Sequence, residues 1–185
     1  MPNYYTRKGD DGWTGLLGDE RVPKSHPKPK SYGAVDEASA ALGLARAFST
    51  SSQVQQVIKD VQMDMYHLMA ELAATDSQVD KFQTISPEQV DDLEAHIEAF
   101  GAQVDMPQAF VIPGDTQSSA AFHLARTVVR RAEREVANLA EHDGLSNPSI
   151  LPYLNRLSSL CFVLSLYEEK SAGVGSPSTT KSEER

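Results

Sequence analysis

The chain has 185 residues, of which 40% are hydrophobic and 23% are charged, and its formal net charge is −9. This length allows one domain with a sizeable core, and the composition excludes a disordered or fibrous protein. A nucleic-acid binder needs an excess of Lys and Arg on one face, so the negative charge excludes a general nucleic-acid-binding function. Any anionic ligand must therefore be bound by a local basic cluster.

The hydrophobic residues predict a cytoplasmic protein that does not enter a membrane. No apolar run approaches the roughly 20 residues that span a bilayer, and the first residues lack the apolar segment of a signal peptide. The single cysteine, Cys161, lies in an apolar run and cannot form an internal disulfide. We expect it to be a buried thiol.

The chain is expected to fold as one domain over residues 1–170. Residues 1–30 contain four glycines, several prolines and many charges without an apolar period, which predicts a loop. Residues 31–170 are expected to form a helical bundle. Residues 171–185 are rich in Gly, Ser, Thr and charges, which cannot bury enough apolar surface to offset ordering, so we expect a disordered tail.

Five segments carry apolar residues at three- and four-residue steps, the spacing that places them on one face of a helix. These segments begin near Ser31, near Val54, at Ser86, near Asp115 and near Ile150. No segment shows the alternation of a strand, and no internal repeat is present. The predicted fold class is therefore all-α, a five-helix bundle with an N-terminal glycine-rich nucleotide loop.

The glycine-rich segment from Thr6 to Gly15 combines glycines, hydroxyl groups and basic residues. Such a segment can wrap backbone N–H groups around a phosphate. It lacks the P-loop pattern, and no strand is expected before it. A glycine-rich surface turn with solvated charges has the same composition, so both interpretations stay open.

The long helix after Asp115 carries four arginines within nine residues: Arg126, Arg130, Arg131 and Arg134. Arg126 and Arg130 lie one turn apart beside the apolar stripe, where a partly buried guanidinium needs a carboxylate or a phosphate. A ladder of structural ion pairs is the alternative. We expect Arg131 and Glu135 to form such a pair.

Polar residues also interrupt two other apolar helices. Asp36 lies among small apolar residues of the first helix, where it can pair with one of the arginines. Asn155 and Arg156 interrupt the last helix. Each alone is typical of a hydrogen-bonded polar group in a core, whereas together they indicate polar convergence. The histidines have no Cys or His partners at zinc spacing, so no structural metal is indicated.

Four blocks of sequence between about Tyr5 and Tyr167 resemble the PduO-type ATP:cob(I)alamin adenosyltransferases (corrinoid adenosyltransferases). The blocks are Thr6–Thr14, then Arg21–Lys24 with Tyr32–Glu37, then Phe110–Gly114 with Ala125–Arg134, and finally Tyr153–Ser158. The resemblance implies a five-helix bundle of the ferritin-like, cobalamin adenosyltransferase-like kind, assembled as a homotrimer with active sites between subunits. It implies transfer of the 5′-deoxyadenosyl group of ATP to Co(I) of cob(I)alamin, giving adenosylcobalamin and triphosphate.

The resemblance also implies roles for individual residues. Those expected to bind ATP are Thr6, Arg7, Gly9, Asp10, Gly12, Thr14, Lys24, Lys28, Arg130, Glu133 and Asn155. Arg130 would offset the charge that grows on the leaving triphosphate. Asp36 and Arg126 match the family's interhelical ion pair beside the corrinoid. Phe110 matches the aromatic residue that displaces the lower axial ligand of cobalt, so these four residues form the expected catalytic set.

The resemblance further implies Mg²⁺ held through the ATP phosphates, so no metal site made by protein side chains alone is expected. It implies a flavoprotein reductase and an adenosylcobalamin-dependent enzyme as partners.

The sequence departs from the family pattern at several positions, among them Lys8 and Trp13. Lys28 stands where arginine is frequent, and Asp115 replaces a glycine. The alternatives are a catalytically inactive helical regulator that binds ATP or a corrinoid, and a structural bundle whose arginines only form ion pairs.

Overall fold

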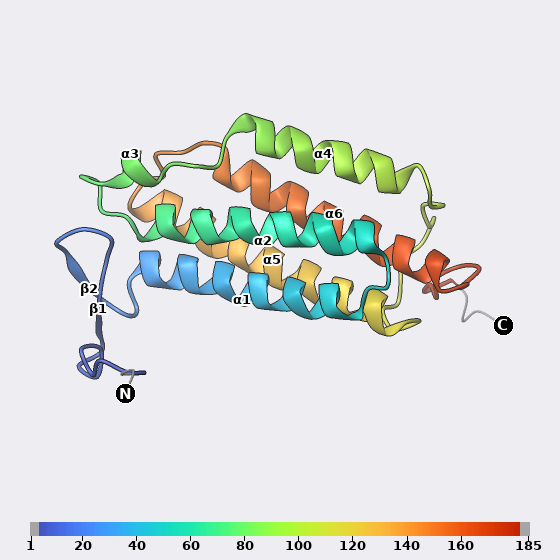
Figure 1. Cartoon of the computed structure of the whole chain (residues 1–185), viewed down its shortest axis with the longest axis horizontal. Coiled ribbons are helices and arrows are strands. Elements are labelled where there is room, and N and C mark those ends of the chain that lie inside the picture. Colours follow the sequence, from blue (N-terminus) through green and yellow to red (C-terminus); the bar gives the residue numbers. More distant parts are fainter. Residues whose placement is uncertain (1–3, 182–185) are drawn as a thin grey trace.

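The computed structural model describes residues 4–181 and shows a bundle of helices with a small hairpin at one end (Figure 1). The elements are β1 (Trp13–Gly15), β2 (Arg21–Pro23), α1 (Pro27–Phe48), α2 (Ser52–Ala73), α3 (Val79–Phe82), α4 (Pro87–Gly101), α5 (Gln117–His142) and α6 (Ile150–Ser171). The predicted five-helix bundle is confirmed by α1, α2, α4, α5 and α6. The four-residue α3 is an additional single turn between α2 and α4.

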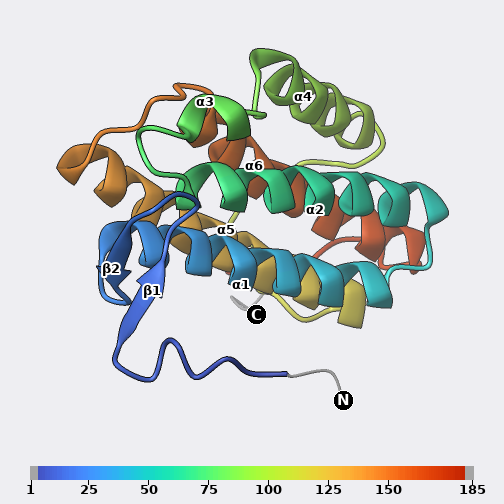
Figure 2. The same cartoon turned by 60° about the vertical axis from the view of Figure 1, so that its left-hand side comes forward.

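The long helices pack in a continuous series. Helix α1 packs against α2 and α5, α5 packs against α6, and α4 covers α6. Figures 1 and 2 show α4 on the outside of the bundle, on the side away from α1. Helices α1, α5 and α6 are therefore the inner elements of this series, because each packs against two other long helices.

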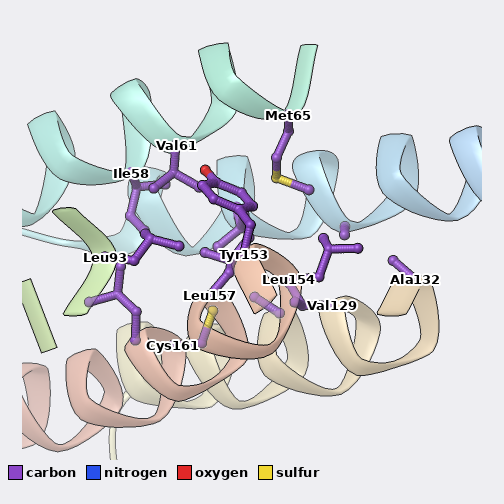
Figure 3. Packing of buried hydrophobic residues seen from close by; sticks show 14 of the residues in the cluster. Ile58, Val61, Met65, Leu93, Val129, Ala132, Tyr153, Leu154, Leu157 and Cys161 are labelled. Carbon is purple, nitrogen blue, oxygen red and sulfur yellow. The ribbon is translucent and has the colours of Figure 1, made fainter. Parts of the chain in front are cut away.

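The core lies between these helices and consists of the apolar stripes seen in the sequence (Figure 3). The ring of Tyr153 on α6 is fully buried, and its hydroxyl donates to Oδ2 of Asp64 on α2 at 3.0 Å. Burial raises the pKa of Tyr153 well above its ordinary value, with the Asp64 charge acting in the same direction. The predicted buried thiol is confirmed, because Cys161 is fully buried and burial raises its pKa to about 12.

Helix α6 is the one helix within residues 4–181 that is long and apolar enough to cross a membrane by length and composition. Of its most apolar 18-residue window, which has a mean hydropathy of 1.2, 61% is buried inside the bundle. The core helix of a water-soluble protein meets the same two criteria. The apolar side chains of α6 are used here to pack against α4 and α5.

The first helix begins earlier than the sequence predicted. We expected a loop through residue 30, but α1 begins at Pro27 and includes Pro29 in its first turn. The N–H groups of the first turn have no partner within a helix, so proline removes no hydrogen bond there. His26 caps this end, because its Nδ1 accepts from Lys28 N at 3.2 Å.

The structure also contains a hairpin that the sequence does not predict. Strands β1 and β2 are antiparallel, with Trp13 opposite Pro23 and Gly15 opposite Arg21. Each has only three residues, too few to display the alternation by which a strand is recognised in a sequence. The hairpin replaces part of the predicted N-terminal loop.

The turn of the hairpin is attached to the end of α2. Leu17 N donates to Ala73 O at 2.8 Å, and Thr75 N donates to Leu17 O at 3.1 Å. The next residue, Gly18, has a φ of 150°, and a Cβ placed on it would lie 2.4 Å from Thr75 Oγ1. Only glycine allows this close approach, so the position of the hairpin depends on it.

The tail differs from the prediction of disorder over the residues that the structure describes. Helix α6 ends at Ser171, and residues 178–180 then lie antiparallel to the segment that precedes α5, with Val111 opposite Thr179. The backbone groups of that segment form hydrogen bonds with the tail, and such bonds need no apolar side chain. The amino-acid composition of the tail therefore could not reveal this pairing. Residues 182–185 of the predicted tail lie outside the described residues.

Replacing Gly18 with Ala should lower the free energy of unfolding by roughly 1–3 kcal/mol, because the added Cβ collides with Thr75 in a backbone conformation that L-residues rarely adopt. Gly15→Ala is the matched control, since a Cβ there meets no atom within 4 Å. Urea unfolding followed by circular dichroism measures both. Equal midpoints for the two variants would contradict the role given to Gly18.

Candidate functional site

The glycine loop before β1 folds into two tight turns. Asp10 N donates to Arg7 O at 3.3 Å, and Gly12 N donates to Gly9 O at 3.2 Å. Gly12 has a φ of 81°, and Arg7 has a φ of 60°, a conformation that non-glycine residues rarely adopt. The loop is therefore a defined structure rather than an extended connection.

The other N-terminal residues predicted to bind ATP lie on these turns or next to them. Thr6, Arg7 and Asp10 are exposed, whereas Thr14 is half-buried in β1. Thr6 Oγ1 accepts from Lys8 N at 3.4 Å, and the guanidinium of Arg7 lies 5.3 Å from the centre of the Tyr5 ring. The structure thus brings the predicted residues from Thr6 to Gly12 together on one loop, and Thr14 lies in the strand that directly follows it.

Arg21 on β2 holds the loop in place, although it was not among the predicted site residues. Its Nη2 donates to Lys8 O at 2.8 Å and forms a salt bridge with Asp11 at 3.2 Å. Asp11 in turn accepts from Trp13 N at 3.0 Å. The hydrogen bond from Trp13 and the charge of Arg21 lower the pKa of Asp11. Arg21 is therefore a positioning residue of the loop, in one of the blocks that carry the family resemblance.

The two lysines predicted to bind ATP lie in different surroundings. Lys24 N donates to Gly12 O at 2.9 Å, and a Cβ on Gly9 would lie 3.1 Å from Lys24 Nζ, so the ammonium group lies beside the loop. Lys28 instead donates from Nζ to Ala74 O at 2.7 Å, after the end of α2, and pairs with Asp76 at 3.4 Å. The structure brings Lys24 to the glycine loop and directs Lys28 away from it.

The loop projects from the end of the bundle, next to the start of α1 (Figures 1 and 2). Within residues 4–181, no hydrogen bond or ion pair joins residues 4–12 to α5 or α6. The predicted ATP-binding residues of those helices, Arg130, Glu133 and Asn155, are therefore not joined to the loop within one chain. One chain carries two separate parts of the predicted site.

The arginines of α5 have different partners. Arg131 pairs with Glu37 on α1, so the expected ion pair between Arg131 and Glu135 is wrong. The α1–α5 packing brings Glu37 closer than the neighbour one turn along α5. Arg130 is exposed, and Arg126 is half-buried with a buried Nε that has no hydrogen-bond partner in the described part of the chain. Arg126 and Arg130 are thus the arginines left for a ligand or another subunit.

A chain of polar side chains runs from α5 across α6 to α4. Asn155 donates from Nδ2 to Glu133 Oε1 at 2.9 Å and accepts from Arg156 Nη1 at 2.9 Å. Arg156 Nε donates to Glu94 Oε1 at 2.7 Å. The polar convergence predicted from the sequence is therefore present. It joins Asn155 of α6 to Glu133, which lies one turn beyond Arg130 on α5.

An open pocket of about 510 Å³ lies between α5, α6 and the segment that precedes α5. Phe110 lines it together with Arg126 and Arg130. The ring of Phe110 is 85% exposed, so it contributes little to the core and is available to a ligand. Met106 and Phe162 are among the apolar residues of the same pocket. The pocket combines apolar surface with two cationic groups, which suits a large ligand that is apolar in one part and anionic in another.

Asp36 does not pair with Arg126 within one chain. Asp36 is exposed on α1, and no ion pair or hydrogen bond of its side chain occurs among residues 4–181. The ion pair implied by the family resemblance is therefore absent from the single chain. Its two members, an exposed carboxylate and a half-buried guanidinium, remain available for a contact between chains.

His123 lines the same pocket, although the sequence predicts no site role for this histidine. It is 3% exposed, and neither ring nitrogen has a hydrogen-bond partner within the described residues. Burial and the charge of Arg126 lower its pKa, while Asp115 acts in the opposite direction. A neutral imidazole is therefore expected beside Arg126. In the sequence, the position of His123 one turn before Arg126 indicates that the two side chains lie on the same face of the helix.

Across residues 4–181, no group of three or more His, Cys, Asp or Glu side chains is arranged to hold a metal ion. Glu133 is the carboxylate nearest in sequence to Arg130 on α5. Its Oε1 accepts from Asn155, whereas its Oε2 takes part in no described hydrogen bond. One such oxygen suits a divalent cation that is held mainly by phosphate oxygens and water.

Comparison with known proteins gives a consistent result. A family model described as cobalamin adenosyltransferase matches residues 4–168. A corrinoid adenosyltransferase of Mycobacterium bovis is 40% identical over 172 residues, covering 89% of this chain and 88% of that protein. The corrinoid adenosyltransferase PduO of Citrobacter freundii is 35% identical over 169 residues, covering 91% of this chain and 50% of that protein. The chain thus spans about half the length of the PduO relatives from C. freundii and Salmonella typhimurium.

Solved structures show the same similarity in three dimensions. A variant of the PduO-type ATP:corrinoid adenosyltransferase of Lactobacillus reuteri, complexed with cobalamin and ATP, matches with a TM-score of 0.86 and 28% identity. The match covers 92% of this chain and 96% of that chain. Another variant of the L. reuteri protein, complexed with ATP, matches with a TM-score of 0.83 at 28% identity, covering 91% of this chain and 95% of that one.

The polar chain through Asn155 gives a prediction about stability. Asn155→Ala should lower the free energy of unfolding by about 1–2 kcal/mol, because Glu133 and Arg156 each lose a partner at a half-buried position. Ser159→Ala, at an exposed position one turn further along α6, should change it by less than about 0.5 kcal/mol. Denaturant midpoints measure both. A similar loss in the two variants would show that the polar chain does not stabilise the bundle.

Proposed function

The chain belongs to the cobalamin adenosyltransferase family, and we propose that it transfers the 5′-deoxyadenosyl group of ATP to Co(I) of cob(I)alamin. The products are adenosylcobalamin and triphosphate. The observation that carries this proposal is the open pocket in which the exposed ring of Phe110 lies with Arg126 and Arg130. A corrinoid has a broad apolar face, and the triphosphate of ATP is the anion that the guanidinium groups require.

The reaction needs no nucleophile from the protein. The electron pair of Co(I) forms a bond to the 5′ carbon of ATP, and the bond from that carbon to the triphosphate oxygen breaks. Triphosphate leaves with the electron pair of that bond. The chain's own residues therefore have to orient the two substrates, exclude water and balance charge.

Arg130 is proposed to act on the leaving group. It is exposed on α5, lines the pocket and has no carboxylate partner within residues 4–181. A guanidinium can form two parallel hydrogen bonds to phosphate oxygens, and its charge stabilises the charge that grows as triphosphate departs. Glu133 lies one turn further along α5, Asn155 of α6 donates to it at 2.9 Å, and both are proposed to bind ATP together with Arg130.

Phe110 is proposed to face the corrinoid. Its ring can fill the lower axial side of cobalt but cannot ligate the metal, so it favours a four-coordinate cobalt that is easier to reduce to Co(I). Arg126 and Asp36 are proposed to form an ion pair beside the corrinoid. Because these two residues are not paired within one chain, the pair would join neighbouring subunits.

The glycine loop is proposed to hold the triphosphate. Its exposed backbone and the ammonium of Lys24 next to Gly9 supply the donors and the charge for it. The binding set is Thr6, Arg7, Gly9, Asp10, Gly12, Thr14 and Lys24. Lys28 would join this set only by leaving its contacts with Ala74 and Asp76. When Mg²⁺ is bound it neutralises phosphate charge, and Glu133 is the residue that would help to hold it.

We further propose a homotrimer whose active sites lie between subunits. The glycine loop projects from the bundle and so can reach the α5 residues of another chain (Figure 1). Large apolar side chains are exposed on the α1–α5 pair, with Leu44 and Phe48 at 45% and Leu124 at 51%. These exposed apolar residues lie on the two helices that also carry Asp36 and Arg126, which favours burial of these helices against another subunit. Light scattering that gives a monomer mass would contradict this assembly.

The reaction consumes Co(I), so it requires a reductant and a compartment that keeps cobalt reduced. We therefore propose cytoplasmic localisation, a flavoprotein reductase as the electron source and an adenosylcobalamin-dependent enzyme as the recipient of the product. The reductase is proposed because the substrate must contain Co(I), and the recipient enzyme is proposed because the product is adenosylcobalamin.

The direct test is to mix the protein with Mg-ATP and chemically reduced cobalamin without oxygen, and to follow the absorbance spectrum together with released triphosphate. Equal amounts of adenosylcobalamin and triphosphate are expected. Protection from thermal unfolding by Mg-ATP without any product would contradict the transferase and favour an inactive regulator. Absence of both product and protection would favour a structural bundle.

Arg130→Ala should lower kcat/KM roughly 100- to 1,000-fold, because it removes charge stabilisation that is needed most in the transition state. Arg134→Ala is the matched control, since Arg134 is an exposed arginine one turn further along α5 that donates to the backbone oxygen of Arg130. Arg130→Lys should recover only part of the loss, because lysine lacks the guanidinium fork. Near-normal efficiency of Arg130→Ala would reject the assigned role.

Phe110→Ala should leave the melting temperature nearly unchanged, because the ring is 85% exposed. It should reduce the fraction of four-coordinate Co(II) and lower kcat/KM for the corrinoid about tenfold or more, which is a loss of ~1.4 kcal/mol in transition-state stabilisation. Tyr66→Ala removes another exposed aromatic residue, on α2, and serves as the control. An unchanged Co(II) spectrum of the Phe110 variant would count against its role.

A further inference from the structure

The segment that carries Phe110 is paired with residues that follow α6. Ile112 N donates to Ser178 O at 2.7 Å, and Thr180 N donates to Phe110 O at 3.0 Å. Val111 lies opposite Thr179 in an antiparallel bridge. The backbone on both sides of Val111 is therefore fixed by a segment that is about 70 residues distant in the sequence.

Asp115 holds this pairing at its end nearest α5. Its Oδ2 accepts from Ser178 N at 2.7 Å, and its Oδ1 accepts from Ser178 Oγ at 2.7 Å. Both carboxylate oxygens are thus used by one residue of the tail. These two hydrogen bonds lower the pKa of Asp115, so its carboxylate is ionised at neutral pH. Hydrogen bonds to an ionised acceptor are stronger than those between neutral groups.

The pairing matters because the Phe110 side chain has little packing of its own. Its ring is 85% exposed, so the core does not decide where it points. The direction of a side chain in an extended segment follows from the backbone, since neighbouring residues point to opposite faces. The hydrogen bond from Thr180 to Phe110 O fixes that backbone at Phe110 itself.

We infer that Asp115 and Ser178 are positioning residues that clasp the tail to the segment of Phe110 and thereby fix the ring at the corrinoid side of the pocket. This inference rests on the proposed function. Asp115 stands where the family resemblance predicts glycine, and glycine has no side chain with which to bind Ser178. The clasp is therefore a property of this chain rather than of the general family pattern.

Hydrogen exchange of the full-length protein tests the clasp without any substrate. Asp115→Ala and Ser178→Ala should each speed exchange of the Ile112 and Thr180 amides about tenfold, because both amides donate across the pairing that the clasp closes. Asp115→Asn, which keeps one acceptor oxygen, should have a smaller effect. Ser176→Ala is the control, since Ser176 is an exposed serine of the same segment with no described hydrogen bond. Unchanged exchange in both clasp variants overturns the clasp.

Kinetics with the wild type as reference then test the positioning role. The clasp variants should raise KM for the corrinoid about 3- to 10-fold and reduce the fraction of four-coordinate Co(II), while KM for ATP stays within twofold. Faster amide exchange with unchanged corrinoid kinetics would overturn the positioning role while leaving the clasp intact. A wild-type protein that forms no adenosylcobalamin would refute the proposed function, and would be recognised before any variant is compared.

Discussion

The burial of α6 is the constraint on which the rest of the structure depends. This helix is apolar along most of its length and is covered by α4 and α5, so its polar side chains cannot all reach water. Tyr153 and Asn155 instead bond to Asp64 on α2 and Glu133 on α5. A buried polar group without a partner costs about 1–3 kcal/mol, so these bonds fix how α2 and α5 are aligned with α6. This alignment of α5 places Arg126 and Arg130 in the lining of the pocket.

Two clusters of basic side chains in this acidic chain are not joined to each other by any hydrogen bond or ion pair among residues 4–181. One is the loop beside Lys24, outside the end of the bundle, and the other is the middle of α5. A polyanionic substrate bound by the loop of one chain and by α5 of another would hold the two chains together. Assembly and substrate binding would then be linked, and the protein's concentration would affect both.

Most of the bundle could be predicted because each long helix carries apolar residues at three- and four-residue steps, a pattern that can be recognised without knowledge of the neighbouring helices. The failures have local or long-range causes. The prolines of α1 looked like loop residues, although the first turn of a helix tolerates them. The partner of Arg131 is Glu37 rather than Glu135, and the tail pairs with the Phe110 segment. Both contacts join residues far apart in the chain, where neither spacing nor composition carries a signal. The roles of individual site residues came from the family resemblance, whereas the physical pattern alone indicated the glycine loop, Asp36, the arginines of α5 and the polar pair Asn155 and Arg156.

The attachment of the hairpin to α2 divides the N-terminal region into a fixed base and a free edge. Leu17 is paired with the end of α2, and Arg21 ties the turn at Lys8 to β2, whereas Tyr4 and Tyr5 are exposed at the edge. Ordering one residue costs about 1–2 kcal/mol of conformational entropy. Binding of a ligand that orders only the residues at this edge costs much less conformational entropy than binding that must order the whole N-terminal region. Part of the affinity for such a ligand is therefore set by hydrogen bonds that never touch it.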